Sequence, residues 1–121
     1  MKFILVAVIL LAVTACTTIR PGPDAFLSAE EGITEAEKVG GDEFAPVEMR
    51  FAREKLASAQ KGMDKQKYEV ALYLVEQSEI NSELAIAKSR AAKSRRRVNE
   101  QRQSNEELER KLRETFGDEF E

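Results

Sequence analysis

Residues 65–116 have the sequence KQKYEVALYLVEQSEINSELAIAKSRAAKSRRRVNEQRQSNEELERKLRETF, which contains neither proline nor glycine. Its most frequent residues (Glu, Lys, Arg, Gln, Ala and Leu) lose little side-chain freedom when they enter a helix. A helix of about 50 residues is roughly 75 Å long at 1.5 Å per residue. We therefore predict one long carboxyl-terminal helix, against which the preceding segments pack.

The two halves of this predicted helix differ in their apolar pattern. Residues 68–75 (YEVALYLV) are apolar on nearly all sides, so we expect neighbouring helices to surround them. Beyond them one thin line continues at steps of three and four residues: Ile80, Leu84, Ala87, Ala91, Ser94, Val98, Gln101, Asn105, Leu108 and Leu112. Because polar residues interrupt the line, the distal half is either a weak coiled coil with a second copy or partner, or a single solvated helix.

Two shorter helical patterns precede the long one. In the first, an apolar stripe is formed by Phe26, Ala29, Ile33 and Ala36. Asp24 is the expected N-cap of this helix, and Gly40-Gly41 is its expected end.

The second pattern starts at Pro46, a residue suited to the first position of a helix. Its apolar line consists of Met49, Ala52, Leu56, Ala59 and Met63, which we expect Phe51 to widen. Gly62 and Asp64 are expected to mark the turn before the long helix. The chain is thus predicted to be all-α, with a short helical hairpin or three-helix base and a long carboxyl-terminal helix.

The amino terminus has the pattern of a bacterial secretion signal. Met1-Lys2 is positively charged, and Phe3–Val13 is apolar but shorter than the ~20 residues that span a bilayer. Val13-Thr14-Ala15-Cys16 resembles the lipobox of bacterial lipoproteins. The resemblance implies cleavage between Ala15 and Cys16, and attachment of palmitate-type lipid to Cys16.

Thr17 follows the cysteine where the enterobacterial sorting rule places Asp for inner-membrane retention. The resemblance therefore favours the outer membrane, with the protein facing the periplasm. We divide the chain into a signal peptide (1–15), a lipidated tether (16–23), a helical domain (24–94), the distal part of the long helix (95–116) and an acidic tail (117–121).

The composition argues against several functional classes. The chain has no histidine, and Cys16 is its only cysteine, so common zinc sites and the Ser-His-Asp and Cys-His arrangements are absent. The net charge of −3 gives no chain-wide affinity for nucleic acid. We predict no catalytic residue, no metal site, no cofactor, no enzymatic activity and no nucleic-acid partner.

A cluster of basic residues stands out in the long helix: Lys88, Arg90, Lys93, Arg95, Arg96 and Arg97. One interpretation is a solvated surface that faces the acidic residues Glu106, Glu107 and Glu109 of a neighbouring copy. The other is a binding site for an anionic partner such as peptidoglycan carboxylates, phosphate-bearing lipids or an acidic protein. No aromatic residue interleaves the cluster, which gives no support to single-stranded nucleic acid.

Two family resemblances complete the pattern. Residues 61–74 are similar to half of a tetratricopeptide repeat, but a stable solenoid needs about three such units. The larger resemblance, over residues 23–94, is to small bacterial lipoproteins of the domain-of-unknown-function 4398 family. It is carried by Ile33, Ala36, Phe44-Ala45-Pro46, Ala52, Lys55-Leu56, Ala59, Tyr68, Ala71 and Leu84-Ala85-Ile86-Ala87. The Gly-Asp-Tyr turn usual in that family is represented here by Lys67-Tyr68 without its Gly-Asp.

Three functional hypotheses follow. The first is a non-enzymatic structural or adaptor lipoprotein that engages itself or a protein partner through the long helix. The second is a binding module for an anionic envelope polymer such as peptidoglycan, acting through the basic cluster. The third is an accessory subunit of an envelope enzyme or transporter.

Overall fold

The computed structural model describes residues 20–117, and every described element is helical. A 3₁₀ turn, η2 (Pro23–Phe26), leads into α2 (Leu27–Lys38). The short α3 (Gly41–Phe44) and the longer α4 (Pro46–Asp64) follow. The last helix, α5 (Tyr68–Phe116), has 49 residues. The prediction of an all-α fold with a long carboxyl-terminal helix is confirmed.

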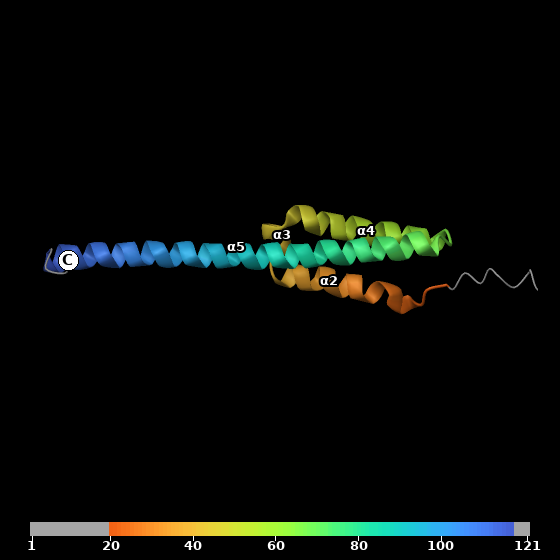
Figure 1. The fold of residues 1–121 in the computed structure, drawn as a ribbon, viewed down its shortest axis with the longest axis horizontal. Helices are drawn as coiled ribbons and strands as arrows, with labels where there is room; N and C mark the ends of the chain where they lie inside the picture. The colour runs from red at the N-terminus through yellow and green to blue at the C-terminus, as the bar shows by residue number, and fades with distance from the viewer. Residues whose placement is uncertain (1–19, 118–121) are drawn as a thin grey trace, which may run out of the picture.

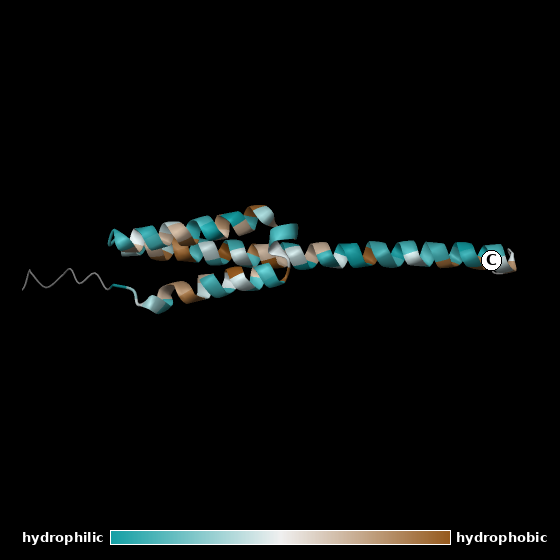
Figure 2. Cartoon of the chain, turned by 180° about the vertical axis from the view of Figure 1, so that it is seen from behind, coloured by the Kyte–Doolittle hydropathy of each residue, from teal (hydrophilic) through white to brown (hydrophobic). Residues whose placement is uncertain are grey.

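The molecule is a three-helix base with a projecting rod (Figure 1). Helix α4 runs antiparallel to the first half of α5, and α2 runs parallel to it on another side. Beyond this base α5 continues alone, and Figure 2 shows that the rod is mainly hydrophilic with isolated apolar residues. The amino-terminal end of the described chain and the tip of the rod lie at opposite ends of the molecule.

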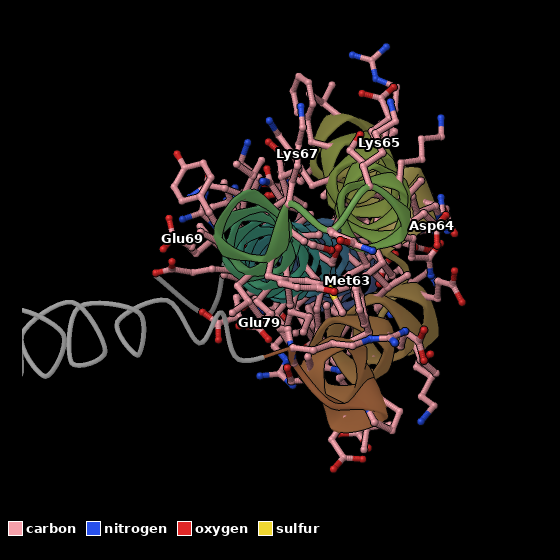
Figure 3. All side chains as sticks on the ribbon, turned by 90° about the vertical axis from the view of Figure 1, so that its right-hand side faces the viewer. Met63, Asp64, Lys65, Lys67, Glu69 and Glu79 are labelled. Atoms are coloured by element: carbon pink, nitrogen blue, oxygen red, sulfur yellow. The ribbon has the colours of Figure 1, made fainter. Side chains whose placement is uncertain are left out.

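The core is narrow because α5 presents small residues to its neighbours. Seen end-on, the three helices occupy the corners of a triangle, with Met63 near its centre (Figure 3). The buried residues of α5 recur at steps of three and four: Ala71, Val75, Ser78, Ser82, Ala85 and Ser89. We call this line the inner face. The small side chains of the inner face let the backbones of α2 and α4 approach α5 closely.

Two glycines show how close the helices are. A Cβ atom on Gly32 of α2 would lie 2.9 Å from Ser82 Oγ, and one on Gly62 of α4 would lie 3.2 Å from Ala71 Cβ. The buried serine hydroxyls are satisfied by backbone carbonyls. Ser78 donates to the carbonyl of Ala52 across the α4–α5 interface at 2.8 Å.

The connection between α2 and α4 depends on a glycine pair. Gly40 has φ of 85°, a left-handed conformation that ends α2. Gly41 is buried and begins α3, a single helical turn between α2 and α4. Pro46 stands at the start of α4, as predicted.

Several local predictions were wrong. Asp24 lies within the 3₁₀ turn, and no side chain caps either η2 or α2. Phe51 does not widen the apolar line of α4 but is 40% exposed, with the Arg50 guanidinium 5.3 Å from its ring centroid. Gly62 is not in a turn but inside α4, where its missing side chain admits α5.

The largest correction concerns residues 68–75. We expected neighbouring helices to surround them, yet Val70 is 53% exposed, Leu72 43% and Tyr73 59%. Helices α2 and α4 both pack on the inner face, where small residues let them approach closely. Two neighbours on one side leave the opposite side of α5 uncovered.

The turn between α4 and α5 contains a backbone conformation that the sequence pattern did not reveal. Gln66 has φ of 57°, and it is the only non-glycine residue with positive φ in the described part of the chain. Position 66 stands two residues before Tyr68, where the Gly-Asp-Tyr pattern has its glycine. The left-handed backbone gives a physical reason for glycine at this position.

Candidate interaction surface

The exposed side of α5 carries a second regular line of residues. It consists of Val70, Tyr73, Gln77, Ile80, Leu84, Ala87, Ala91, Ser94, Val98, Gln101, Asn105, Leu108 and Leu112. We call this line the outer seam. Its steps alternate between three and four without a break, the spacing of a and d positions in a coiled coil. At ~100° per residue it lies roughly 150° around the helix from the inner face.

The outer seam is accessible along its whole length. Every member is exposed except Gln77, which is half-buried. The large apolar members illustrate this, since Ile80 is 49% exposed, Val98 50% and Leu108 55%. Sequence reasoning found this line from Ile80 onward but missed its first three members. The unbroken spacing back through Gln77 and Tyr73 was the signal that could have found them.

A shallow hollow lies on the outer seam just beyond the base. It is lined by Ala91, Ser94, Arg95, Val98, Asn99 and Arg102. The small side chains of Ala91 and Ser94 create it, because they leave space between larger neighbours. A large side chain of a packing partner would fit there as a knob fits into a hole.

The predicted basic cluster is divided by the structure. Lys88 pairs with Glu48 of α4, and the Arg96 guanidinium lies 3.9 Å from a Glu43 carboxylate oxygen and 3.0 Å from one of Glu100. The contacts with Glu48 and Glu43 join α5 to the end of the base, and all three contacts use part of the cluster's charge internally.

Two more members of the cluster also face the base. Arg90 lies 3.7 Å from a carboxylate oxygen of Glu35, and the Lys93 ammonium lies 5.9 Å from the ring centroid of Phe44. Among residues 20–117, Arg95 and Arg97 form no ion pair with any described carboxylate. The six residues therefore do not form one uniform anion-binding surface.

A further ion-pair network closes the same end of the base. Arg53 of α4 donates to both carboxylate oxygens of Asp42, at 2.8 and 3.1 Å, and to Glu37 at 2.7 Å. These bonds hold the pKa of the Asp42 carboxyl below its usual value and raise the pKa of Arg53. The hydrogen bond from Lys88 lowers the pKa of Glu48 in the same way.

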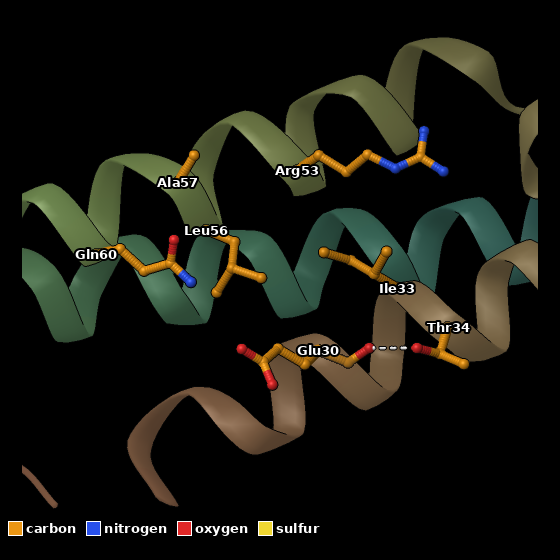
Figure 4. Close-up of a pocket in the computed structure, with 7 residues that line it drawn as sticks. All are labelled: Glu30, Ile33, Thr34, Arg53, Leu56, Ala57 and Gln60. Atoms are coloured by element: carbon orange, nitrogen blue, oxygen red, sulfur yellow. Dashed lines mark hydrogen bonds between the residues drawn. The ribbon is translucent and has the colours of Figure 1, made fainter. Parts of the chain in front are cut away.

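Helices α2 and α4 are separated by an open groove lined by Glu30, Ile33, Thr34, Arg53, Leu56, Ala57 and Gln60 (Figure 4). Its polar groups do not converge. The Thr34 hydroxyl donates to the carbonyl of Glu30 on its own helix, and the Arg53 guanidinium is held by Asp42 and Glu37. The groove therefore has the character of a packing gap and lacks the convergent polar groups of a ligand site.

Residues 20–117 also lack the features of a metal site and of a membrane-spanning helix. That part of the chain has no group of three acidic, histidine or cysteine side chains placed to hold a metal ion. Within the same residues, no helix combines the length and apolarity needed to cross a membrane. Ala15 and Cys16 lie outside the described residues, so cleavage and lipidation there stay predictions.

Comparison with known proteins identifies one family. A family model described as a domain of unknown function (DUF4398) matches residues 24–101. No curated protein and no solved structure matches the chain. The matched residues cover the whole three-helix base and the first part of the rod, including most of the outer seam.

Proposed function

The chain belongs to the DUF4398 family, and we propose that it is a lipid-anchored, non-enzymatic structural or adaptor protein of the bacterial cell envelope. One observation carries this proposal. The outer seam extends over α5 from Val70 to Leu112 and stays exposed beside the base as well as along the rod. Exposed apolar residues in an unbroken coiled-coil spacing are typical of a surface that packs against another helix.

A photo-crosslinking amino acid in the rod tests this role. We expect a crosslinker at Val98, on the outer seam, to capture a protein in intact cells. Gln103 is the matched control, because it is also exposed on the rod but lies roughly 140° away around the helix. Equal capture from both positions, or capture from neither, would contradict a binding role for the seam.

The anchoring part of the proposal rests on the sequence at Val13–Cys16. Two or three acyl chains hold a protein on a bilayer almost permanently, at ~0.8 kcal/mol per buried methylene. Growth with a palmitate analogue is expected to label the protein, and Cys16→Ser is expected to abolish both the label and membrane retention. A labelled Cys16→Ser protein would disprove lipidation at this residue. Recovery with the outer-membrane fraction tests the proposed location.

Binding of an anionic envelope polymer is the second candidate function, and Arg95 and Arg97 favour it. Both are exposed and form no ion pair within residues 20–117. A sacculus pull-down should then lose binding when both are changed to Gln, whereas Lys88→Gln, which affects a cation already paired with Glu48, should retain it. Equal binding by all three proteins, or by none, would contradict this function.

An accessory role in an envelope enzyme or transporter is a special case of the adaptor proposal. The protein captured at Val98 would distinguish it, because such a role requires a catalytic or transport subunit among the crosslinked products.

A further inference from the structure

One edge of the outer seam changes its charge along the helix. The residues immediately before every second seam position, starting at Val70, are seven residues apart: Glu69, Glu76, Glu83, Arg90, Arg97, Ser104 and Lys111. Beside the base this edge is acidic, and towards the rod it is basic. In coiled coils, residues at these g positions pair with the partner helix and determine its direction.

The edge is available for such pairing. Glu76, Glu83 and Arg97 form no ion pair with one another or with any other side chain in residues 20–117. Arg90 has only a contact of 3.7 Å with Glu35, longer than a hydrogen bond, and its side chain is 66% exposed.

A second copy running in the opposite direction complements this edge. In this alignment the two α5 helices are antiparallel, and the centre of the pair lies midway between Ala85 and Ile86. The g positions of one copy then face the g positions of the other. Glu76 of each copy then lies beside Arg97 of the other, and Glu83 beside Arg90. The twofold symmetry makes four oppositely charged pairs. No like-charged pair arises at this edge over Glu76–Arg97.

The same alignment also matches side-chain sizes within the seam. It places Leu84 opposite Ala87, Ile80 opposite Ala91, Gln77 opposite Ser94 and Tyr73 opposite Val98. Leu84 and Ile80 therefore meet alanines, the polar Gln77 meets a polar partner, and Tyr73 packs on the apolar Val98. The hollow at Ala91 and Ser94 receives Ile80 and Gln77 of the second copy.

A parallel pair fits less well on both counts. It would stack the small residues Ala87, Ala91 and Ser94 on themselves in three consecutive layers, which leaves space unfilled. In a parallel coiled coil, each g position faces the e position five residues later in the partner. Arg90 would then face Arg95, and Arg97 would face Arg102.

We propose that the outer seam binds a second copy of this chain in antiparallel orientation, centred between Ala85 and Ile86. The proposal rests on the proposed role of the outer seam as a protein-binding surface. It adds the identity of the partner, its direction and its alignment.

Disulfide trapping tests the alignment in the full-length chain. Two copies with different tags are co-expressed, one with Ile80→Cys and the other with Ala91→Cys, and membranes are oxidised mildly. We expect a disulfide between the two tags. Each variant expressed alone should give none, because residues 80 of the two copies lie about 16 Å apart along the axis, beyond the reach of a disulfide. The wild-type chain, whose only cysteine is Cys16, is oxidised in parallel to show whether Cys16 itself forms a disulfide.

A second pair, Tyr73→Cys with Val98→Cys, repeats the test at an independent layer. All four positions are exposed in the single chain, so the substitutions do not disturb its core. Dimers that form from a single variant alone would show parallel pairing and overturn the proposal. Absence of a disulfide from both mixed pairs would also overturn it. Capture of a different protein at Val98 would then still support the adaptor function.

Charge exchange supplies a test that does not depend on cysteine. Glu76→Lys and Arg97→Glu should each weaken the dimer about tenfold, since each turns two attractive pairs into repulsive ones. The double variant should recover most of the affinity, as measured by sedimentation of the full chain in detergent. Lys61→Glu on the exposed side of α4 is the matched control and should leave the affinity unchanged. Additive weakening in the double variant would contradict the alignment.

Discussion

At the scale of single residues, the fold depends on places where no side chain fits. Gly41 is the sharpest case, because a Cβ there would lie 2.7 Å from Met49 Sδ and 2.8 Å from the carbonyl oxygen of Ala36. The backbone oxygen cannot rotate away as a flexible side chain could. Gly41 therefore sets how closely the α2–α4 connection approaches the core.

We expect Gly41→Ala to lower the free energy of unfolding by about 1–3 kcal/mol, the usual range for overpacking a filled core. Urea titration followed by circular dichroism measures the change. Gly22→Ala is the control, since a Cβ at Gly22 meets nothing within 4 Å. An unchanged midpoint for Gly41→Ala would show that the connection can shift at little cost.

Gln66 offers a change in the opposite direction. Its φ of 57° costs a residue with a Cβ roughly 1–2 kcal/mol, whereas glycine adopts this conformation readily but loses more freedom on folding. We expect Gln66→Gly to raise the free energy of unfolding by up to about 1 kcal/mol. Gln66→Val, whose branched side chain opposes positive φ, should lower it in the same titration. The reverse order would contradict a left-handed backbone at this turn.

At the scale of helices, ion pairs join the rim of the base where α2 ends and α4 begins beside α5. The pKa of Asp42 is held below 3.8 by Arg53, and that of Glu48 below 4.5 by Lys88. A lowered pKa in the folded state means that the folded protein favours the ionised carboxylate. The stabilisation is therefore complete above these ordinary values and is lost as the pH falls through and below them.

Lys88→Met tests this rim directly. It removes the partner of Glu48 while keeping much of the aliphatic stem, and we expect a loss of up to about 1 kcal/mol at neutral pH. The melting temperatures of the two proteins should converge as the pH is lowered through and below 4.5. Protonation of Glu48 then removes from the wild type the ion pair that the variant already lacks. A constant difference across that pH range would show that Lys88 acts through packing.

The helices also show why part of the structure could be predicted and part could not. The absence of proline and glycine over 52 residues was sufficient for α5, and Pro46 for the start of α4. Alanine and serine carry almost no hydrophobic signal, so the inner face of Ser78, Ser82 and Ser89 was not recognised. The prediction that residues 68–75 are surrounded is wrong at Val70 and Tyr73, because hydropathy does not indicate which face of a helix a neighbour covers.

The ion pairs of the basic cluster could not be predicted either, because their partners are distant in the sequence. Lys88, Arg90 and Arg96 lie about 40 to 55 residues from Glu48, Glu35 and Glu43, and no local spacing predicts those contacts. Both interpretations of the cluster, a solvated surface facing a neighbouring copy and a site for an anionic partner, overlook these contacts because the acidic residues are distant in the chain.

At the scale of the whole molecule, antiparallel pairing has a consequence for membrane geometry. The amino-terminal end of each base lies near the start of its α5 helix. In the proposed alignment Val70 of one copy faces Gln101 of the other, so the two Val70 residues, each close to the start of its helix, are about 46 Å apart along the axis. A tether of eight residues reaches at most ~28 Å. An upright pair would hold one of the two starts farther from the bilayer than its tether can reach, so both anchors reach one bilayer only if the long axis is inclined towards its surface.

This geometry predicts where the tip of the rod lies. A fluorophore placed at Leu108 in the full-length protein, reconstituted in vesicles, should be quenched by a lipid-borne quencher about as strongly as one at Lys61 in the base. A monomer standing on the membrane would instead carry Leu108 beyond the quencher's range, because about 60 Å of helix separates it from the start of α5 at Tyr68. Glu76→Lys should weaken the quenching at Leu108 while leaving that at Lys61 unchanged, since it weakens the pair without affecting the anchor. Strong quenching at Lys61 with none at Leu108 in the unaltered chain would show an upright rod, and would contradict an antiparallel pair on one membrane.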